Sequence, residues 1–283
     1  MLKLKSFAKI NIGLEVLYKR QDGYHEINTI FSRIGLADEI LIEQNKELIV
    51  DCFPSLELHQ QQNLAYKSGK LIQKYFACKS KGAKIQIYKN IPLGGGLGGG
   101  SSNASTVLTG LNKLWQLNAS AQELHDLASQ LGADVPFFLG ADFAVGKGIG
   151  EKLDFFNFSL PYHLFLVMPN FNIDTSWAYS QLNRKYKIIE GSDLKNILIE
   201  NINRPEKLRE LIKNAFEDIV FEKYPVLSDI KNDLYKSGAV FALMSGSGSS
   251  IYGFFDDEDN LNNAKSQFNK YQTFSSLQNH INK

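Results

Sequence analysis

The residues with the clearest chemical purpose are six glycines between positions 94 and 100, in the stretch PLGGGLGGGSSNAS. Glycine at the start of a helix weakens the fold, so a compensating reason is expected. Glycines let the backbone approach an anion closely, and the free N–H groups at a helix N-terminus attract negative charge. Ser101 and Ser102 could cap the helix, donate to phosphate oxygens or bind a phosphate-bound Mg²⁺. The stretch therefore predicts a phosphate-binding loop rather than a flexible linker.

Three common phosphate-binding loops do not fit this stretch. A Walker A loop needs a lysine before its Ser or Thr, and here Ser101 and Ser102 follow the last glycine directly. The pattern G-x-G-x-x-G is present, but no acidic residue lies near position 119, as a dinucleotide-binding oxidoreductase would require. A protein-kinase glycine loop leads into a strand, and the HRD and DFG motifs are missing. These three classes are excluded.

The elements around the loop show two periodicities. Alternating apolar and polar residues predict strands with one buried face at 9–17, 39–44 and 83–88. Helical spacing of apolar residues predicts helices over 63–76 and 104–115. A further helix should begin at Ser120, which forms a capping box with Glu123, and should end at Gly132.

The second half of the chain predicts a separate domain. A soft boundary near residue 155 divides the chain into domains 1–155 and 156–283. The patterns predict a strand within 160–170, helices at 174–183, 205–222 and 225–236, two strands joined by a Gly/Ser turn in 239–255, a helix in 256–271 and a last strand near 272–277. The polar region 183–195 is the best candidate for a mobile loop. Together these elements predict an α+β fold.

Composition narrows the classes of partner. The 283 residues carry 31 basic and 30 acidic side chains, so no basic excess indicates binding to nucleic acid or to an anionic membrane. Two cysteines without CxxC spacing predict neither a disulfide framework nor a zinc ribbon. No uncharged apolar run reaches the ~18 residues of a membrane-spanning helix. The sequence predicts a cytoplasmic protein and leaves its oligomeric state open.

Three motifs together resemble the GHMP kinases, the family of galactokinase, homoserine, mevalonate and phosphomevalonate kinases. Residues 8–16 (AKINIGLEV) resemble the first motif of this family, 92–105 the second, and 243–255 (LMSGSGSSIYGFF) the third glycine-rich loop. Within the family, RQDGYH at 20–25 and LGADVPFFL at 131–139 are similar to the branch that acts on a cytidine-diphosphate-linked sugar alcohol.

This resemblance implies a fold and an activity. The fold would be an N-terminal ribosomal-protein-S5-like α/β domain followed by a C-terminal ferredoxin-like α+β domain. The activity would be ATP-dependent phosphorylation of the 2-hydroxyl of that small-molecule sugar alcohol, a step of the non-mevalonate route to isoprenoid precursors, with Mg²⁺ as cofactor. Another GHMP kinase of the homoserine or mevalonate type, and a non-catalytic member of the family, remain as alternatives. The Mg²⁺ ligands are left open.

The resemblance also implies two catalytic residues. Lys9 would stabilise the attacking alkoxide and the charge on the transferring phosphoryl group. Asp134 would accept the substrate proton, which a loose transition state releases late. The alternative interpretations are a solvated strand lysine for Lys9 and a helix N-cap for Asp134. Because both residues are present, the resemblance favours a working enzyme over a non-catalytic member.

The binding residues implied by the resemblance fall into two groups. The acceptor substrate would be bound by Asn11, Tyr24, His25, Thr175 and Tyr179, with the DGYH turn holding the cytosine. ATP would be bound on its adenosine side by Asn63 and Lys89, and on its phosphate side by Pro92, Leu93, Gly94, Gly95, Gly96, Leu97, Gly98, Gly99, Gly100, Ser101 and Ser102. No function is assigned to the remaining histidines, which are scattered without ligand spacing.

Overall fold

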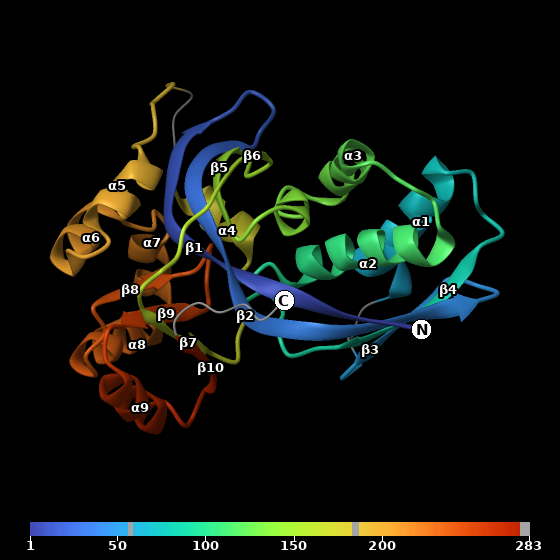
Figure 1. Ribbon diagram of the computed structural model, residues 1–283. Helices are drawn as coiled ribbons and strands as arrows, with labels where there is room; N and C mark the ends of the chain where they lie inside the picture. The colour runs from blue at the N-terminus through green and yellow to red at the C-terminus, as the bar shows by residue number, and fades with distance from the viewer. Residues whose placement is uncertain (56–58, 183–186, 278–283) are drawn as a thin grey trace. The chain divides into compact units, whose positions relative to one another are not determined.

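The structure is a computed structural model that describes residues 1–55, 59–182 and 187–277 (Figure 1). The chain forms two compact units. Unit 1 consists of Met1–Ala8, Leu36–Leu93 and Gly98–Ala141, and unit 2 consists of Lys9–Gly35, Gly94–Leu97 and Asp142–Lys283. These units interleave along the sequence. The division into domains 1–155 and 156–283 stays a prediction.

Unit 1 packs helices on a short sheet. The second half of β2 (His25–Asn45) pairs antiparallel with β4 (Gly82–Tyr88), and β3 (Ile49–Phe53) pairs parallel with β4. The helical elements are η1 (Gln60–Gln62), α1 (Leu64–Tyr75), α2 (Gly99–Trp115), α3 (Ala121–Leu131) and η2 (Pro136–Leu139). The core joins the inward residues of the strands to one face of α2, through Ile40, Ile42, Ile85, Ile87, Val107, Leu108 and Leu111. Alternation in the strands and helical spacing in α2 place these apolar residues on facing surfaces.

The start of α3 confirms the predicted capping box. The Ser120 hydroxyl accepts a hydrogen bond from the Glu123 N–H at 3.2 Å, and the Glu123 carboxylate accepts one from the Ser120 N–H at 2.8 Å. The hydrogen bonds that the Ser120 N–H and the Ser120 hydroxyl donate to the carboxylate lower the pKa of Glu123. Gly132 ends the helix as predicted.

Unit 2 contains two groups of strands. In one, β1 (Leu2–Lys19) from Lys9 onward lies beside the first half of β2, which pairs with β5 (Phe143–Gly148), and β5 pairs with β6 (Lys152–Phe156). In the other, the order is β10 (Gln272–Ser276), β7 (His163–Met168), β9 (Ile251–Phe255) and β8 (Phe241–Met244). The helices are α4 (Thr175–Gln181), α5 (Leu194–Asn201), α6 (Pro205–Leu211), α7 (Glu217–Lys223), α8 (Pro225–Lys236) and α9 (Glu258–Gln267). The predicted α+β class is confirmed.

One predicted helix in unit 2 is wrong. The segment 205–222 forms two helices, because residues 212–216 leave the helical path to pair with β1. The Leu14 N–H donates to the Lys213 carbonyl at 2.9 Å, and the Ala215 N–H donates to the Leu14 carbonyl at 2.8 Å. A tertiary strand contact of this kind overrides local helical spacing.

Other elements differ from the sequence prediction in extent. The predicted strands 9–17 and 39–44 are parts of the longer β1 and β2, and the short strands β5 and β6 were not predicted. Residues 183–186 of the predicted mobile loop lie outside the described residues, and α5 begins at Leu194, inside the predicted loop. No helix in the described part of the chain is long and apolar enough to span a bilayer.

Candidate active site

A buried serine joins the three motifs within unit 2. The Ser245 side chain is fully buried; its hydroxyl accepts a hydrogen bond from the Asn11 N–H at 3.3 Å and donates to the Gly96 carbonyl at 2.9 Å. One side chain from the third motif therefore bridges the first motif and the glycine loop. The sequence analysis quoted Ser245 within the third motif but assigned it no role.

Backbone contacts reinforce this junction. The Lys9 N–H donates to the Leu97 carbonyl at 3.0 Å. The Ser250 N–H donates to the Gly95 carbonyl at 3.2 Å. Lys9 and Ser250, which lie far apart in the sequence, are thus both held against residues 94–97 by the protein's own hydrogen bonds.

Two glycines of the loop have a packing reason. Gly96 has φ +75°, and a Cβ there would lie 2.0 Å from the Ser245 carbonyl oxygen. Gly94 has φ +64°, and a Cβ there would meet the Asn172 side chain at 2.7 Å. Only glycine permits both the left-handed backbone and these approaches. Packing against Asn172 and Ser245 therefore explains the glycines at positions 94 and 96, and a bound phosphate is not needed to explain them.

Lys9 is not a solvated strand lysine. It is only 4% exposed, and its ammonium donates to the Asn11 side-chain oxygen at 2.6 Å. Asn11 in turn donates from its amide nitrogen to the Thr29 hydroxyl at 2.9 Å. The Lys9 ammonium also lies 5.5 Å from the centre of the Phe31 ring. Neighbouring strands thus fix the direction of this cation.

The predicted cytosine residues lie in unit 2 at the start of β2 and on α4. Tyr24 follows the predicted turn, in which Gly23 has φ +89° and the Tyr24 N–H bonds to Asp22, and its side chain is 61% exposed. The His25 ring stacks on the Tyr179 ring, with centroids 5.0 Å apart. The Thr175 and Ser247 hydroxyls are hydrogen-bonded at 2.8 Å, which ties α4 to the third motif.

The second half of the glycine loop begins α2 in unit 1. Gly98 precedes the helix with φ +68°. Ser102 is buried, and its hydroxyl accepts a hydrogen bond from the Ser6 hydroxyl at 2.8 Å, so it serves the fold. Ser101 is only partly buried, which leaves it the better placed of the two for a ligand. A Cβ on Gly99 would lie 2.8 Å from Ile91.

A buried carboxylate supports the approach to α2. Asp38 is fully buried; one oxygen accepts hydrogen bonds from the Asn90 N–H at 2.7 Å and the Ile91 N–H at 2.8 Å. Its other oxygen pairs with the Lys89 ammonium and accepts a hydrogen bond from the Asn103 amide at 2.8 Å. The Lys89 ammonium, which the sequence assigned to ATP, is therefore engaged in holding the loop to the helix.

The sequence contained a signal for this ion pair. Asp38 alternates with Ile40 and Ile42 along β2, so all three side chains lie on the same face of the strand, and all three are fully buried. A charged residue on a core-facing register needs a partner, because an unpaired buried charge is costly. Asp38 precedes the predicted strand 39–44 and had no role predicted from the sequence.

A small pocket in unit 1 adjoins a predicted adenosine contact. It has a volume of about 350 Å³, and its lining includes Cys52, Phe53 and Asn63. Asn63 caps α1 by accepting a hydrogen bond from the Ala65 N–H at 2.9 Å, and its amide donates to the Cys52 sulfur at 3.3 Å. Burial raises the pKa of the Cys52 thiol. Asn63, which was predicted to contact the adenosine side of ATP, therefore lines this pocket.

Asp134 lies in the turn between α3 and η2 and is partly buried. The residue before η2 is Val135, so Asp134 does not occupy the cap position. Unit 1 holds Asp134, Asn63, Lys89 and residues 98–102, whereas unit 2 holds Lys9, Asn11 and the predicted cytosine residues. The structure brings predicted residues together inside each unit.

Side chains that could ligate a metal ion do not cluster in the described part of the chain. No group of three or more His, Cys, Asp or Glu side chains among the described residues could hold a metal ion. Mg²⁺ does not depend on such a group, since it usually keeps several waters and is held by one or two protein oxygens together with substrate phosphates.

The chain matches two family models, the GHMP kinases N terminal domain over residues 63–141 and the GHMP kinases C terminal domain over residues 198–272. The fold agrees with a crystal structure of mevalonate kinase at a TM-score of 0.71, with 16% identity over 99% of this chain and 100% of that one. The fold and the joined motifs are those of a GHMP kinase, a class whose members use ATP.

More similar relatives narrow the class. A 4-diphosphocytidyl-2-C-methyl-D-erythritol kinase from Pelodictyon phaeoclathratiforme is 42% identical over 91% of this chain and 90% of its own. One from Thermodesulfovibrio yellowstonii is 37% identical over 96% and 95%. A crystal structure of 4-(cytidine 5'-diphospho)-2C-methyl-D-erythritol kinase matches with 30% identity and a TM-score of 0.82, over 99% of this chain and 100% of that one. The chain belongs to the 4-diphosphocytidyl-2-C-methyl-D-erythritol kinase family.

We expect the replacement Asp38→Ala to destabilise the protein by about 3–5 kcal/mol, because it leaves the Lys89 charge buried without its partner. The double variant Asp38→Ala/Lys89→Met should recover part of this loss, since it removes the unpaired charge but leaves the Asn90 and Ile91 N–H groups without their acceptor. Urea unfolding monitored by circular dichroism measures both effects.

The matched control for this pair is Asp233→Ala, which breaks an exposed ion pair with Lys236 on α8. It should cost less than about 1 kcal/mol. A loss of similar size for Asp38→Ala would show that Asp38 does not support the loop.

Proposed function

We propose that this chain transfers the γ-phosphoryl group of ATP to the 2-hydroxyl of 4-diphosphocytidyl-2-C-methyl-D-erythritol, a step of the non-mevalonate route to isoprenoid precursors. The observation that carries the proposal is the full-length similarity to relatives that bear the name of this one activity. The buried Lys9 supports it, because its ammonium is held in a fixed direction by Asn11, as a group that stabilises developing negative charge requires.

On the acceptor side, Lys9 supplies positive charge where the attacking oxygen and the transferring phosphoryl group become negative. Its hydrogen bond to Asn11 fixes the direction of the ammonium before substrate arrives, so little reorganisation is needed during the reaction. Asp134 accepts the proton of the hydroxyl. A carboxylate is a weak base toward an alcohol, but a loose transition state needs the proton to leave only late.

On the nucleotide side, residues 92–102 surround the phosphates, with the N–H groups of the first turn of α2 directed at them. Ser101 is the hydroxyl that could reach a phosphate oxygen or Mg²⁺, because Ser102 is buried against Ser6 whereas Ser101 is partly exposed. Mg²⁺ would neutralise charge on the β- and γ-phosphates. The pocket at Cys52 and Asn63 takes the adenosine side. Lys89 acts on ATP indirectly, through its ion pair with Asp38.

On the cytidine side, the His25–Tyr179 stack provides an aromatic surface, and Tyr24 provides an exposed ring one residue earlier. A nucleobase needs a flat partner and hydrogen bonds to its edge, which these side chains supply. Thr175 begins α4 next to the third motif and offers a hydroxyl to the same ligand.

The proposal is tested by measuring ADP release with three acceptors. The diphosphocytidyl methylerythritol substrate should give turnover that depends on both ATP and Mg²⁺. Homoserine and mevalonate should each give a kcat/KM at least about 100-fold lower, because neither offers a cytosine to the aromatic surface. Comparable turnover with either control would contradict the proposed substrate.

Replacing either catalytic residue should remove the chemistry and keep the fold. We expect Lys9→Ala and Asp134→Ala each to lower kcat by about 10²–10⁴-fold, since charge stabilisation and proton transfer contribute on this scale. Steady-state kinetics measure the effect, and circular dichroism confirms folding. Lys46→Ala and Asp126→Ala, at exposed positions, serve as controls. If either catalytic variant keeps more than about a tenth of wild-type kcat, its assignment is wrong.

Tyr24→Ala should separate the two substrates. Loss of a stacking partner costs about 1–3 kcal/mol per base, so KM for the cytidine substrate should rise roughly ten- to a hundredfold while KM for ATP stays constant. CMP should inhibit the wild type competitively and the variant more weakly. Tyr75→Ala, which removes a 50% exposed tyrosine from α1, is the control. Equal shifts in both KM values would place the turn away from the cytosine.

A further inference from the structure

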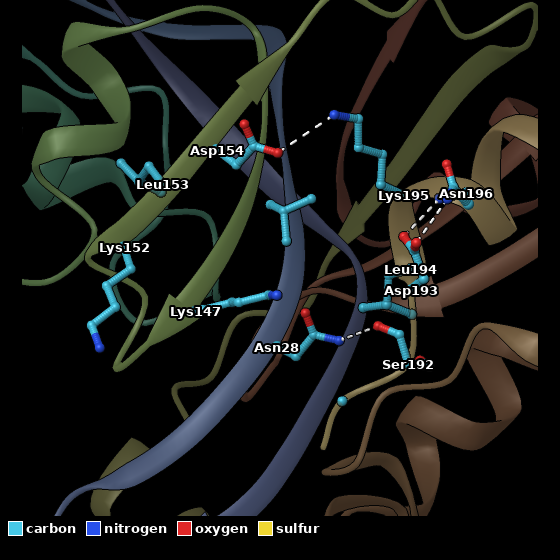
Figure 2. A pocket seen from close by; sticks show the side chains of 12 residues that line it. Asn28, Lys147, Lys152, Leu153, Asp154, Ser192, Asp193, Leu194, Lys195 and Asn196 are labelled. Carbon is cyan, nitrogen blue, oxygen red and sulfur yellow. Dashed lines mark hydrogen bonds and ion pairs between the residues drawn. The ribbon is translucent and has the colours of Figure 1, made fainter.

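A second pocket lies in unit 2, and none of its lining residues is among those assigned above. It has a volume of about 730 Å³, within the range of small-molecule sites. Strands β2, β5 and β6 form one wall, and residues 191–196 at the start of α5 form the other (Figure 2). The polar side chains that line it are Asn28, Lys147, Lys152, Asp154, Ser192, Asp193, Lys195 and Asn196.

The pocket opens on the opposite face of β2 from the catalytic lysine. Thr29 contacts Asn11, and Phe31 lies beneath the Lys9 ammonium, so the odd-numbered side chains of this strand face the proposed active site. Successive side chains of a strand point to opposite faces, which directs Asn28 to the other side. There Asn28 lies directly across from Lys147 on β5.

One atom in this pocket lacks a partner. Asn28 is 2% exposed, and its amide nitrogen uses both protons, one to the Glu15 carboxylate at 2.6 Å and one to the Ser192 carbonyl at 2.8 Å. These two acceptors fix the amide orientation, because a flipped amide would place oxygen against oxygen. The side-chain oxygen of Asn28 has no hydrogen-bond partner among the described residues. A buried acceptor in this state needs a donor.

Two exposed lysines line the same pocket, and in Figure 2 the Lys147 ammonium is directed toward Asn28, whereas the Lys152 side chain extends away from it. Lys147 and Lys152 are exposed, and neither has an ion-pair partner in the described part of the chain. The acidic groups nearby are already engaged. Asp154 pairs with Lys195 at 3.4 Å, and Asp193 accepts a hydrogen bond from the Asn196 N–H at 3.1 Å at the start of α5.

The Glu15 carboxylate behind Asn28 is also engaged. It accepts hydrogen bonds from the Ser192 N–H at 3.0 Å and from the Ser192 hydroxyl. The side chains still available for a ligand are therefore one buried acceptor and two ammonium groups, and Figure 2 shows the Asn28 amide and the Lys147 ammonium directed toward the same space.

We propose that this pocket binds a small phosphorylated polyol, a compound that carries both a hydroxyl and a phosphate. A hydroxyl donates to the Asn28 oxygen, and the phosphate faces Lys147 and Lys152, which provide charge-assisted hydrogen bonds. The site is separate from the active site and takes a ligand of a different class, one without a nucleobase.

Isothermal titration calorimetry with glycerol 3-phosphate tests this proposal. The wild type should bind one equivalent, and Lys147→Ala/Lys152→Ala should weaken the binding by about tenfold or more, since a hydrogen bond to a charged group is worth about 1.5–3 kcal/mol. Lys46→Ala, which removes an exposed lysine from the turn after β2, should leave the affinity unchanged. Absence of binding, or equal affinity in the double variant, overturns the proposal.

Two further arms identify the ligand class and the location. Inorganic phosphate should bind more weakly than glycerol 3-phosphate, because it brings no polyol hydroxyl to Asn28; equal affinity overturns the polyol class. Saturating CMP and ATP should leave the affinity for glycerol 3-phosphate unchanged. Competition by either nucleotide would place the binding in the active site and overturn the separate pocket. The two lysines are absent from the proposed active site, so the double variant should retain wild-type kinase turnover.

Discussion

The buried hydroxyl of Ser245 is the constraint on which the candidate site in unit 2 depends. It accepts from the backbone of Asn11 and donates to the backbone of Gly96, so it fixes the first motif and the glycine loop against the third. A hydroxyl is the smallest group that can do both at once. The approach at Gly96 is so close that no side chain fits there, which links the identity of that residue to the position of Ser245.

In unit 1, a buried carboxylate and not a hydroxyl holds the chain at the glycine loop. Asp38 accepts from two successive backbone N–H groups at residues 90 and 91, and it pairs with Lys89, one residue earlier. These contacts hold the entry to the glycine loop with hydrogen bonds that are stronger in a buried site than in water. Asn103 joins the carboxylate to the first turns of α2. A loop made of glycine has no rigidity of its own, and this network supplies it.

The two faces of β2 illustrate how one strand can serve two sites. Thr29 and Phe31 contact Asn11 and Lys9. Asn28 instead lines the pocket with Lys147 and Lys152, and its side-chain oxygen has no hydrogen-bond partner among the described residues. The left-handed Gly13, with φ +81°, interrupts the alternation of β1 in between. Beyond it, Glu15 contacts Asn28. A left-handed residue within the strand shifts the alternation, so the odd-numbered Asn11 and Glu15 contact side chains on opposite faces of β2.

Local patterns in the sequence determined much of this protein. The capping box of Ser120 and Glu123, the helical face of α2, the turn at Asp22 and Gly23 and the GHMP kinase motifs are all short-range or compositional features, and each could be predicted without a structure. The extent of β2, the break between α6 and α7 at residues 212–216, and the short strands β5 and β6 depend on pairing with distant segments, so local periodicity could not specify them.

The candidate functional residues also fall into those marked by local sequence and those decided by contacts with distant segments. Residue type alone marked the glycine loop, because glycines before a helix are unusual, whereas Lys9 was marked by the resemblance of residues 8–16 to the first GHMP kinase motif. Tertiary structure alone decided that Lys89 pairs with Asp38, that Ser102 bonds to Ser6, and that Gly96 packs against Ser245. Each of these contacts joins residues 51 to 149 positions apart, and a hydrogen bond or a close approach across such a separation is fixed only once the chain has folded.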